Sequence, residues 1–285
     1  MTGTLYLCAT PIGNLEDMTF RAVRVLNEVD LIAAEDTRNS IKLLNHFDIH
    51  TPMTSYHEYN KIEKGRALVE KLLAGTNIAL ITDAGMPGIS DPGEELVRMA
   101  HEAGVTVTVL PGACACVTAL TLSGLPTRRF SFEAFLPTGK KERKEALEPI
   151  RTEQRTIVLY EAPHRLLRTL QDLSDTVGGE RQIRVLRELT KKHESRFAGT
   201  IAEAIAFYTA NEPKGECVLV LAGKPEREMK EEQAKEWETM TVPAHVAMYE
   251  KAGMDRKEAM KAVAKERGIS KRDVYQELLG EQETP

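Results

Sequence analysis

Cysteine, excess positive charge and long apolar runs are all scarce in this sequence of 285 residues. Its four cysteines include one close pair, Cys114 and Cys116, whose spacing does not match the paired ligands of a zinc site. The net charge is −5, so nucleic acid could be bound only through a local basic patch. The first residues lack the pattern of a secretory signal, and no apolar run is long enough to span a membrane. We therefore expect a cytoplasmic protein with reduced thiols and no membrane association.

The motifs of several common enzyme classes are also missing. No glycine-rich stretch ends in the Gly-Lys-Ser/Thr of a P-loop, and the dinucleotide-binding pattern G-x-G-x-x-G does not occur. No serine or cysteine occupies a nucleophile elbow, and the seven histidines lack the paired spacing of metal ligands. These absences argue against phosphate-transfer and hydride-transfer enzymes, and we predict no metal site.

Residues 1–112 alternate between strand-like and helix-like segments. Short apolar or β-branched runs predict strands at 5–9, 31–34, 53–56, 77–82 and 105–110. Apolar residues at helical spacing predict helices at 19–28, 41–47, 67–73 and 94–100. Such alternation is typical of a parallel sheet with helices on both faces. We predict that residues 1–112 form an N-terminal α/β domain.

A second α/β domain is predicted at 113–225. Its expected strands lie at 130–135, 156–161, 183–186 and 217–221, and its expected helices lie at 140–150, after Pro163 and after Thr200. Thr200 and Glu203 have the spacing of a capping box.

Residues 226–285 are predicted to form a helical tail. A charged linking helix precedes three short helical patterns, which are broken near Gly253 and Gly268 in the manner of a helix-turn-helix module. Asp255 and Ser270 are expected N-caps. The basic residues of this tail could contact RNA, although a solvated helix face explains them equally well.

The segment Asp83–Gly93 is an unusually long connection between a strand and a helix, because ordinary ones have about two to six residues. Its three glycines allow close backbone approach to a ligand, and its two prolines restrict its shape. The other unusual segments that follow predicted strands are 10–14, 35–38, 57–58 and 111–115. Since parallel strands end at one edge of a sheet, we expect all five segments to meet at one ligand cleft.

Five motifs, taken in order, resemble those of the ribosomal RNA small subunit methyltransferase I family, a branch of the tetrapyrrole-methylase superfamily. They are Ala9–Leu15, Ala34–Arg38, Asp83–Gly93, Tyr160–Arg165 and Arg187–Lys191. The resemblance covers about the first 225 residues, and the helical tail resembles the family's C-terminal extension. The sequence departs from the family pattern at Met86, where Thr is commoner, and at Cys114 and Cys116, near a position usually held by Ser.

The resemblance implies a parallel-sheet domain, a mixed-sheet domain and a helical module. It also implies S-adenosyl-L-methionine as cofactor, a homodimer, and methyl transfer to a cytidine ribose 2′-hydroxyl in the decoding region of 16S ribosomal RNA. The residues then expected to contact the cofactor are Pro11, Ile12, Ala84, Gly85, Met86, Ile89, Cys114, Ala115, Tyr160, Glu161 and Leu189. A neutral loop of backbone groups suits a zwitterionic tail and a cationic sulfonium better than it suits a triphosphate.

A ribose hydroxyl is a poor nucleophile at neutral pH, so this reaction needs a base or a cation that stabilises the alkoxide. The candidates are Asp36 with Arg38, His57 with Glu58, and Glu188 with Lys191. His57 and Glu58 lead for the base, whereas Arg38 and Lys191 are expected to bind phosphate or stabilise charge. Each candidate could instead belong to a structural ion pair.

Contacts with the RNA backbone are expected from two basic segments. Their residues are Lys140, Lys141, Arg143 and Lys144 in the second domain, and Lys261, Lys265, Lys271 and Arg272 in the tail.

Two other functions remain open from the sequence. A tetrapyrrole methyltransferase would keep the fold and the cofactor, although the basic tail and the turn at Pro11–Asn14 argue against it. A nucleic-acid-binding protein with a non-catalytic α/β scaffold would bind no cofactor at all.

Overall fold

The computed structural model describes residues 1–280, apart from the side chains of residues 230, 232–236, 238 and 280. The chain divides into a compact unit at Met1–Gly223 and a second unit that begins at Lys224. Among the described residues, no helix combines the length and apolar character needed to cross a bilayer.

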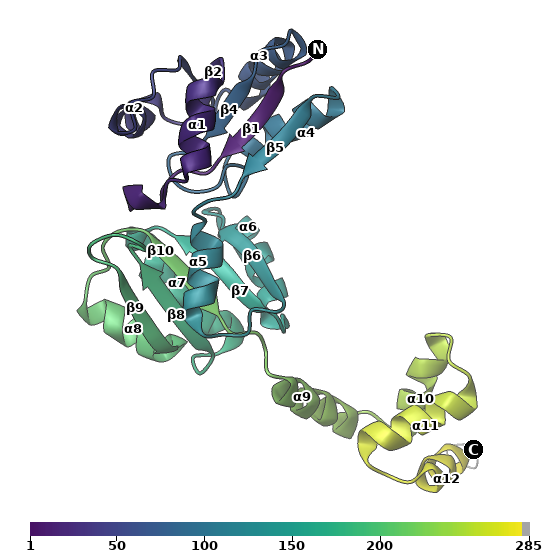
Figure 1. The fold of residues 1–285 in the computed structure, drawn as a ribbon. Coiled ribbons are helices and arrows are strands. Elements are labelled where there is room, and N and C mark those ends of the chain that lie inside the picture. Colours follow the sequence, from purple (N-terminus) through teal and green to yellow (C-terminus); the bar gives the residue numbers. More distant parts are fainter. Residues whose placement is uncertain (281–285) are drawn as a thin grey trace. The chain divides into compact units, whose positions relative to one another are not determined.

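The first unit begins with a five-stranded parallel sheet of order β3-β2-β4-β1-β5 (Figure 1). Its strands are β1 (Thr4–Cys8), β2 (Leu31–Ala34), β3 (Met53–Ser55), β4 (Ile78–Ile81) and β5 (Thr106–Leu110). Its helices are η1 (Leu15–Asp17), α1 (Phe20–Glu28), α2 (Thr37–His46), α3 (Lys61–Leu73) and α4 (Gly93–Glu102).

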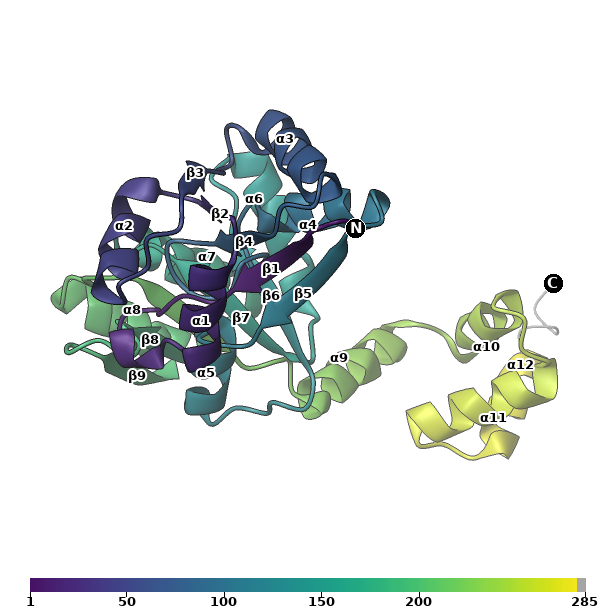
Figure 2. The same cartoon turned by 45° about the horizontal axis from the view of Figure 1, so that its top comes forward.

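Side-chain alternation along β4 explains why helices cover both faces of this sheet (Figure 2). Ala79 and Ile81 pack with α1 and α2 in one core, whereas Ile78 and Leu80 pack with α3 and α4 in another. All four residues of β4 are buried, as in the centre of a parallel sheet. The strands therefore end together at one edge, and their following loops lie side by side there.

The same unit contains a second, mixed sheet of order β6-β7-β10-β8-β9, in which only β6 and β7 pair in parallel. Its strands are β6 (Phe130–Phe135), β7 (Thr156–Glu161), β8 (Gln182–Arg187), β9 (Ser195–Thr200) and β10 (Cys217–Leu221). One face packs on α5 (Ala115–Ser123). The other packs on α6 (Lys140–Leu147), η2 (Pro149–Arg151), α7 (Leu166–Val177) and α8 (Ile201–Ala210). The short helix η3 (Pro163–Arg165) leads into α7.

The second unit consists of α9 (Glu226–Thr239), α10 (Val242–Lys251), α11 (Arg256–Arg267) and α12 (Lys271–Gly280). Val246, Val263 and Val274 form the centre of its small core. Asp255 caps α11 through the backbone N–H groups of Lys257 and Glu258, and α11 ends at Gly268 with a φ of 66°. The last five residues of the predicted tail, 281–285, lie outside the described residues.

The α/β fold class with a parallel sheet, a mixed sheet and a helical tail is confirmed, but several elements differ from the sequence prediction, which contained no helix at α5. β9 was not predicted, because Arg196 and Gly199 interrupt its apolar pattern. α3 begins at Lys61, six residues before the predicted start, because its polar first turns carry no apolar repeat. α6 ends at Leu147, where Pro149 turns the chain into a 3₁₀ helix.

We expect Leu219→Ala to destabilise the protein by about 2–5 kcal/mol, because it leaves a cavity in the central strand of the second sheet. Leu219 is fully buried on β10, between β7 and β8. Leu167→Ala is the matched control, since Leu167 is 37% exposed, and its effect should stay near 0.5 kcal/mol. Denaturant unfolding of both variants measures the difference; equal losses would contradict this packing.

Candidate functional site

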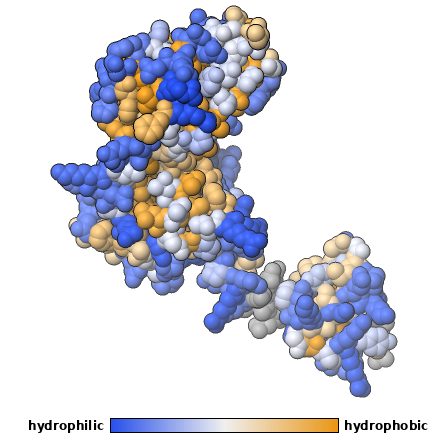
Figure 3. Space-filling model, in the orientation of Figure 1, coloured by the Kyte–Doolittle hydropathy of each residue, from blue (hydrophilic) through white to orange (hydrophobic). Residues whose placement is uncertain are grey.

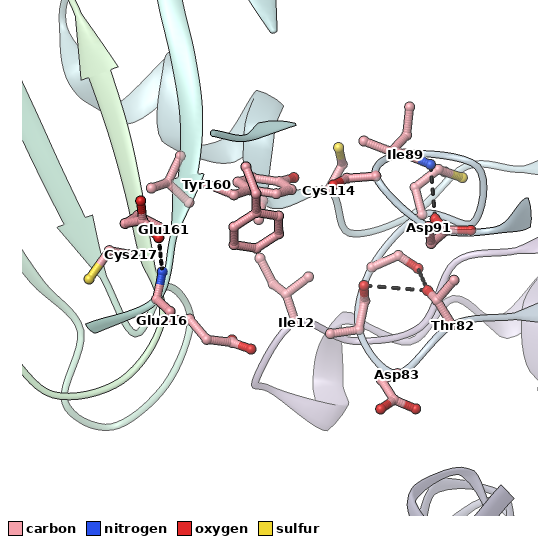
Figure 4. A pocket seen from close by; sticks show the side chains of 18 of the residues that line it. Ile12, Thr82, Asp83, Ile89, Asp91, Cys114, Tyr160, Glu161, Glu216 and Cys217 are labelled. Atoms are coloured by element: carbon pink, nitrogen blue, oxygen red, sulfur yellow. Dashed lines mark hydrogen bonds between the residues drawn. The ribbon is translucent and has the colours of Figure 1, made fainter. Parts of the chain in front are cut away.

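A cleft of about 370 Å³ opens in the first unit at the edge where the parallel strands end (Figure 4). In the close-up, Thr82, Asp83 and Asp91 lie on one side of the cleft, while Glu161 and Glu216 lie on the other. The first group follows β4, and the second group belongs to the ends of β7 and β10. The cleft is therefore bounded by loops of the parallel sheet and by strand ends of the mixed sheet.

Backbone hydrogen bonds fix the long loop after β4. Thr10 and Gly85 exchange two N–H to carbonyl bonds of 2.9 and 3.1 Å, and the Thr10 hydroxyl donates to the carbonyl of Thr82 at 3.2 Å. Gly85 has a φ of 85°, and a Cβ added to it would lie 3.2 Å from Cγ2 of Ile12. Glycine is therefore required here both by conformation and by space.

Asp91 closes the second half of this loop. Its carboxylate accepts the backbone N–H groups of Gly88, Ile89 and Gly93 at 2.7–3.0 Å. Ser90, with a φ of 67°, is held in the left-handed region between these bonds. The sequence prediction for this loop rests on its prolines and glycines, and the structure adds these three hydrogen bonds of Asp91.

Aromatic side chains form the wall opposite the loop. The Tyr160 hydroxyl accepts the backbone N–H of Cys116 at 3.0 Å, which joins β7 to the first turn of α5. Burial raises the pKa of Tyr160, so the hydroxyl stays neutral. Phe135 packs edge-on against Tyr160 with ring centroids 5.6 Å apart, and it is 48% exposed. A register shift in β6, where Ala134 has a φ of 49°, places Phe135 at the cleft.

Glu161 lines the cleft but uses its oxygens within the protein. Oε1 accepts the N–H of Ala162 at 2.9 Å and lies 3.3 Å from the Arg165 guanidinium, while Oε2 accepts the Thr169 hydroxyl at 2.5 Å. Arg143 completes this network by donating to Thr169 and Asp172. Glu161 therefore positions the wall of the cleft through its neighbours.

The burial of Arg143 corrects its predicted role as an RNA contact. The residue is 3% exposed, and its three donor groups bond to Asp172, Thr169 and the Pro137 carbonyl. The burial of Arg143 could not be recognised within a run of lysines and arginines, because the sequence did not show which side of α6 faces α7.

Comparison with known proteins gives the family. Residues 4–205 match the model of the Tetrapyrrole (Corrin/Porphyrin) Methylases. Over 96% of its length, the chain is 51% identical to the ribosomal RNA small subunit methyltransferase I of Halalkalibacterium halodurans and 50% identical to that of Synechocystis, covering 93% and 96% of those proteins. The Escherichia coli O157:H7 enzyme is 42% identical over 98% of this chain and 96% of its own. The chain belongs to the ribosomal RNA small subunit methyltransferase I family.

Solved structures confirm the fold of this family member. Uroporphyrin-III-C-methyltransferase from Thermus thermophilus matches 77% of this chain and 94% of its own with a TM-score of 0.56 and 20% identity. Diphthine synthase matches 77% of this chain and 90% of its own with a TM-score of 0.59 and 14% identity.

The cleft of this ribosomal RNA small subunit methyltransferase I family member brings together nine of the eleven residues predicted to contact cofactor. They are Ile12, Ala84, Gly85, Met86, Ile89, Cys114, Ala115, Tyr160 and Glu161. Pro11 precedes Ile12 in the first turn, and Leu189 packs with Ile12 in a buried cluster behind it. Contact of these residues with a cofactor stays a prediction.

The residues predicted as catalytic are not part of the cleft lining formed by the described residues. Arg38 pairs with Asp36 at 2.7 Å, and this pair lowers the pKa of Asp36 to about 2. Glu58 pairs with Lys61 at 2.5 Å, while the imidazole of His57 lies 3.3 Å from the Asn60 amide. These roles remain predictions, and the geometry favours structural pairs for Asp36 and Glu58.

Lys191 is connected to the cleft by its contact with Glu216, which is a lining residue. The Nζ of Lys191 is 3.0 Å from Glu188 and 3.4 Å from Glu216. The aliphatic chain of Lys191 packs on Gly13, where an added Cβ would lie 2.3 Å from Cγ of Lys191. Desolvation opposes its charge, but these carboxylates raise the pKa of Lys191 overall, so it is cationic.

The remaining predicted RNA-binding residues are all exposed. They are Lys140, Lys141 and Lys144 on α6 and Lys261, Lys265, Lys271 and Arg272 in the second unit. Four other lining residues carry charge, namely Glu35, Asp83, Asp91 and Glu216. The sequence placed the segments of the first three at the cleft but gave their side chains no role. It missed Glu216, whose position directly before β10 was the available signal.

Arg143→Met should destabilise the protein by about 3–5 kcal/mol, because it removes the buried guanidinium that donates to the partly buried Asp172, to Thr169 and to the Pro137 carbonyl. Arg168→Met is the control, since Arg168 is 60% exposed and lies 4.0 Å from the same Asp172 carboxylate. Its effect should be within about 1 kcal/mol. Thermal and urea unfolding compare the two, and similar losses would rule out the buried network as the cause.

Proposed function

We propose that this protein transfers the methyl group of S-adenosyl-L-methionine to a ribose 2′-hydroxyl of a cytidine in the decoding region of 16S ribosomal RNA. The observation that carries the proposal is the cleft, because it gathers nine predicted cofactor residues from both sheets in a member of this family. The curated relatives are named for methyl transfer to small-subunit ribosomal RNA. One solved neighbour is described as complexed with S-adenosyl homocysteine.

The residues of the cleft fit this cofactor chemically. A volume of about 370 Å³ is within the range of ligand pockets, and the lining combines apolar side chains with a glycine-rich loop. Tyr160 and Phe135 offer aromatic faces for an adenine ring. Asp83 and Asp91 provide a negative surface for a cationic sulfonium and an ammonium group.

The acidic lining argues against a tetrapyrrole as the acceptor. Tetrapyrrole precursors carry several carboxylates, which Glu35, Asp83 and Glu216 would repel at close range. An RNA strand can insert a single ribose into such a cleft. Exposed basic residues such as Arg38, Lys140 and Lys141 would then bind the phosphates of the strand outside the cleft.

Methyl transfer to a hydroxyl is a direct displacement, so alignment of the acceptor oxygen with the methyl carbon supplies much of the rate. In this proposal the loop at Gly85 holds the donor, and the wall at Tyr160 limits its movement. A homodimer and a cytoplasmic location are part of the same proposal. Figure 3 shows apolar surface in the region of α5. Val117 of this helix is 53% exposed, and such surface would suit a partner subunit.

The reaction is tested by incubating the protein with labelled methyl donor and small ribosomal subunits from a strain that lacks this activity. Nuclease mapping of the product should locate the label on a cytidine ribose. Label on a base carbon or nitrogen, or on free tetrapyrrole in place of RNA, would contradict the proposed acceptor.

Gly85→Val should weaken S-adenosylhomocysteine binding by at least about tenfold, a loss of about 1.4 kcal/mol, because the side chain would fill space next to Ile12. Gly124→Val is the matched control. Its φ of 69° imposes the same backbone strain, but nothing lies within 4 Å of an added Cβ. Titration calorimetry compares the two variants, and equal affinities would place the binding site elsewhere.

A further inference from the structure

Five carboxylate side chains line the cleft, and they differ in how many hydrogen bonds they accept from the protein. Asp91 accepts three backbone N–H groups, and both oxygens of Glu161 are engaged by groups of its own domain. Asp83 accepts the backbone N–H of Asp36 at 3.2 Å and the Asn39 amide at 3.3 Å. These three carboxylates hold loops in place, so their lone pairs are already committed.

Glu216 and Glu35 are the two other carboxylates that line the cleft. Glu216 is 78% exposed and is already paired with the ammonium of Lys191 at 3.4 Å. Glu35 follows β2 and is half-buried, and its one hydrogen bond among the described residues is a long one of 3.4 Å from the Asp83 N–H to Oε2. Its other oxygen, Oε1, is therefore available to a ligand in the cleft.

The surroundings of Glu35 favour proton uptake. Burial raises its pKa, and the negative charges of Asp83, Asp91 and Asp36 act in the same direction, against the N–H of Asp83. Arg38, in the first turn of α2, is paired with Asp36 at 2.7 Å. A carboxylate whose pKa lies above its usual value is a better base near neutral pH than an ordinary one.

We propose that Glu35 is the general base of the methyl transfer, an inference that rests on the proposed function. The ribose hydroxyl oxygen forms a bond to the methyl carbon while the bond between that carbon and sulfur breaks. The sulfur leaves with the electron pair as a neutral thioether, and the hydroxyl proton passes to Oε1 of Glu35. The positive charge of the donor and the negative charge of Glu35 are both neutralised in the step.

Single-turnover methyl transfer with wild-type protein, Glu35→Gln and Glu35→Asp tests this assignment. Glu35→Gln should lower the rate about 10²–10⁴-fold and abolish the rise of rate with pH that ionisation of Glu35 produces. Glu35→Asp should keep that rise at a lower maximal rate, and S-adenosylhomocysteine affinity should stay within about twofold in both, since the hydroxyl proton is the target. Glu102→Gln, at an exposed carboxylate 62% accessible on α4, is the control and should match the wild type.

Three outcomes separate the possible failures. If wild-type protein places no methyl on ribose, the proposed function fails. If wild type is active and Glu35→Gln keeps both its rate and its acid limb, Glu35 is not the base. If Glu35→Gln loses rate only in proportion to lost S-adenosylhomocysteine affinity, Glu35 holds the donor instead, which also overturns the assignment.

Discussion

The paired backbone hydrogen bonds between Thr10 and Gly85 are the contact on which the cleft depends. β1 and β4 are neighbours in the parallel sheet, so the loops that follow them leave the same edge together. The two bonds tie these loops into one surface, and the positive φ of Gly85 lets the chain turn at that point. Without this link the long loop after β4 would have no fixed position relative to the first turn.

The first turn also reaches the second sheet. Ile12 belongs to a buried cluster with Leu189 and with Ala119 of α5, and Gly13 lies against the aliphatic chain of Lys191. Leu189 is flanked by Glu188 and Thr190, which both have positive φ values, 51° and 65°. Non-glycine residues adopt this conformation only where their surroundings hold them. Here Glu188 accepts the Lys191 ammonium and the Glu216 N–H, so a strained loop is held next to Glu216, which lines the cleft.

The sequence predicts those site residues that are marked by local features, and it does not predict those whose role depends on contacts with distant segments. Strand ends, glycines and prolines are local features, which is why Gly85, Ile89 and Cys114 were placed correctly at the cleft edge. Burial and partner choice depend on distant segments. The pairing of Arg143 with Asp172, 29 positions away, could not be inferred from the charges around it, and it removed one predicted RNA contact.

The same limit applies to the catalytic candidates. His57 and Glu58 end a strand, as a base in this cleft should, but β3 is the edge strand of the sheet, two positions from β4. Glu35 ends β2, which lies directly beside β4, and its carboxyl group therefore reaches the lining. Strand order decides between these residues, and strand order is a property of the sheet that a linear sequence does not display.

The charge distribution around the cleft also suits the order of events in the proposed reaction. A lining with Asp83 and Asp91 attracts the cationic donor, whereas the thioether left after methyl transfer has lost the sulfonium charge. The attraction therefore falls when the reaction is complete, which favours exchange of spent donor for fresh donor. RNA is polyanionic and must be held from outside the lining. Its affinity should then depend on exposed cations such as Lys140 and Lys141, and salt should weaken it far more than it weakens binding of the donor.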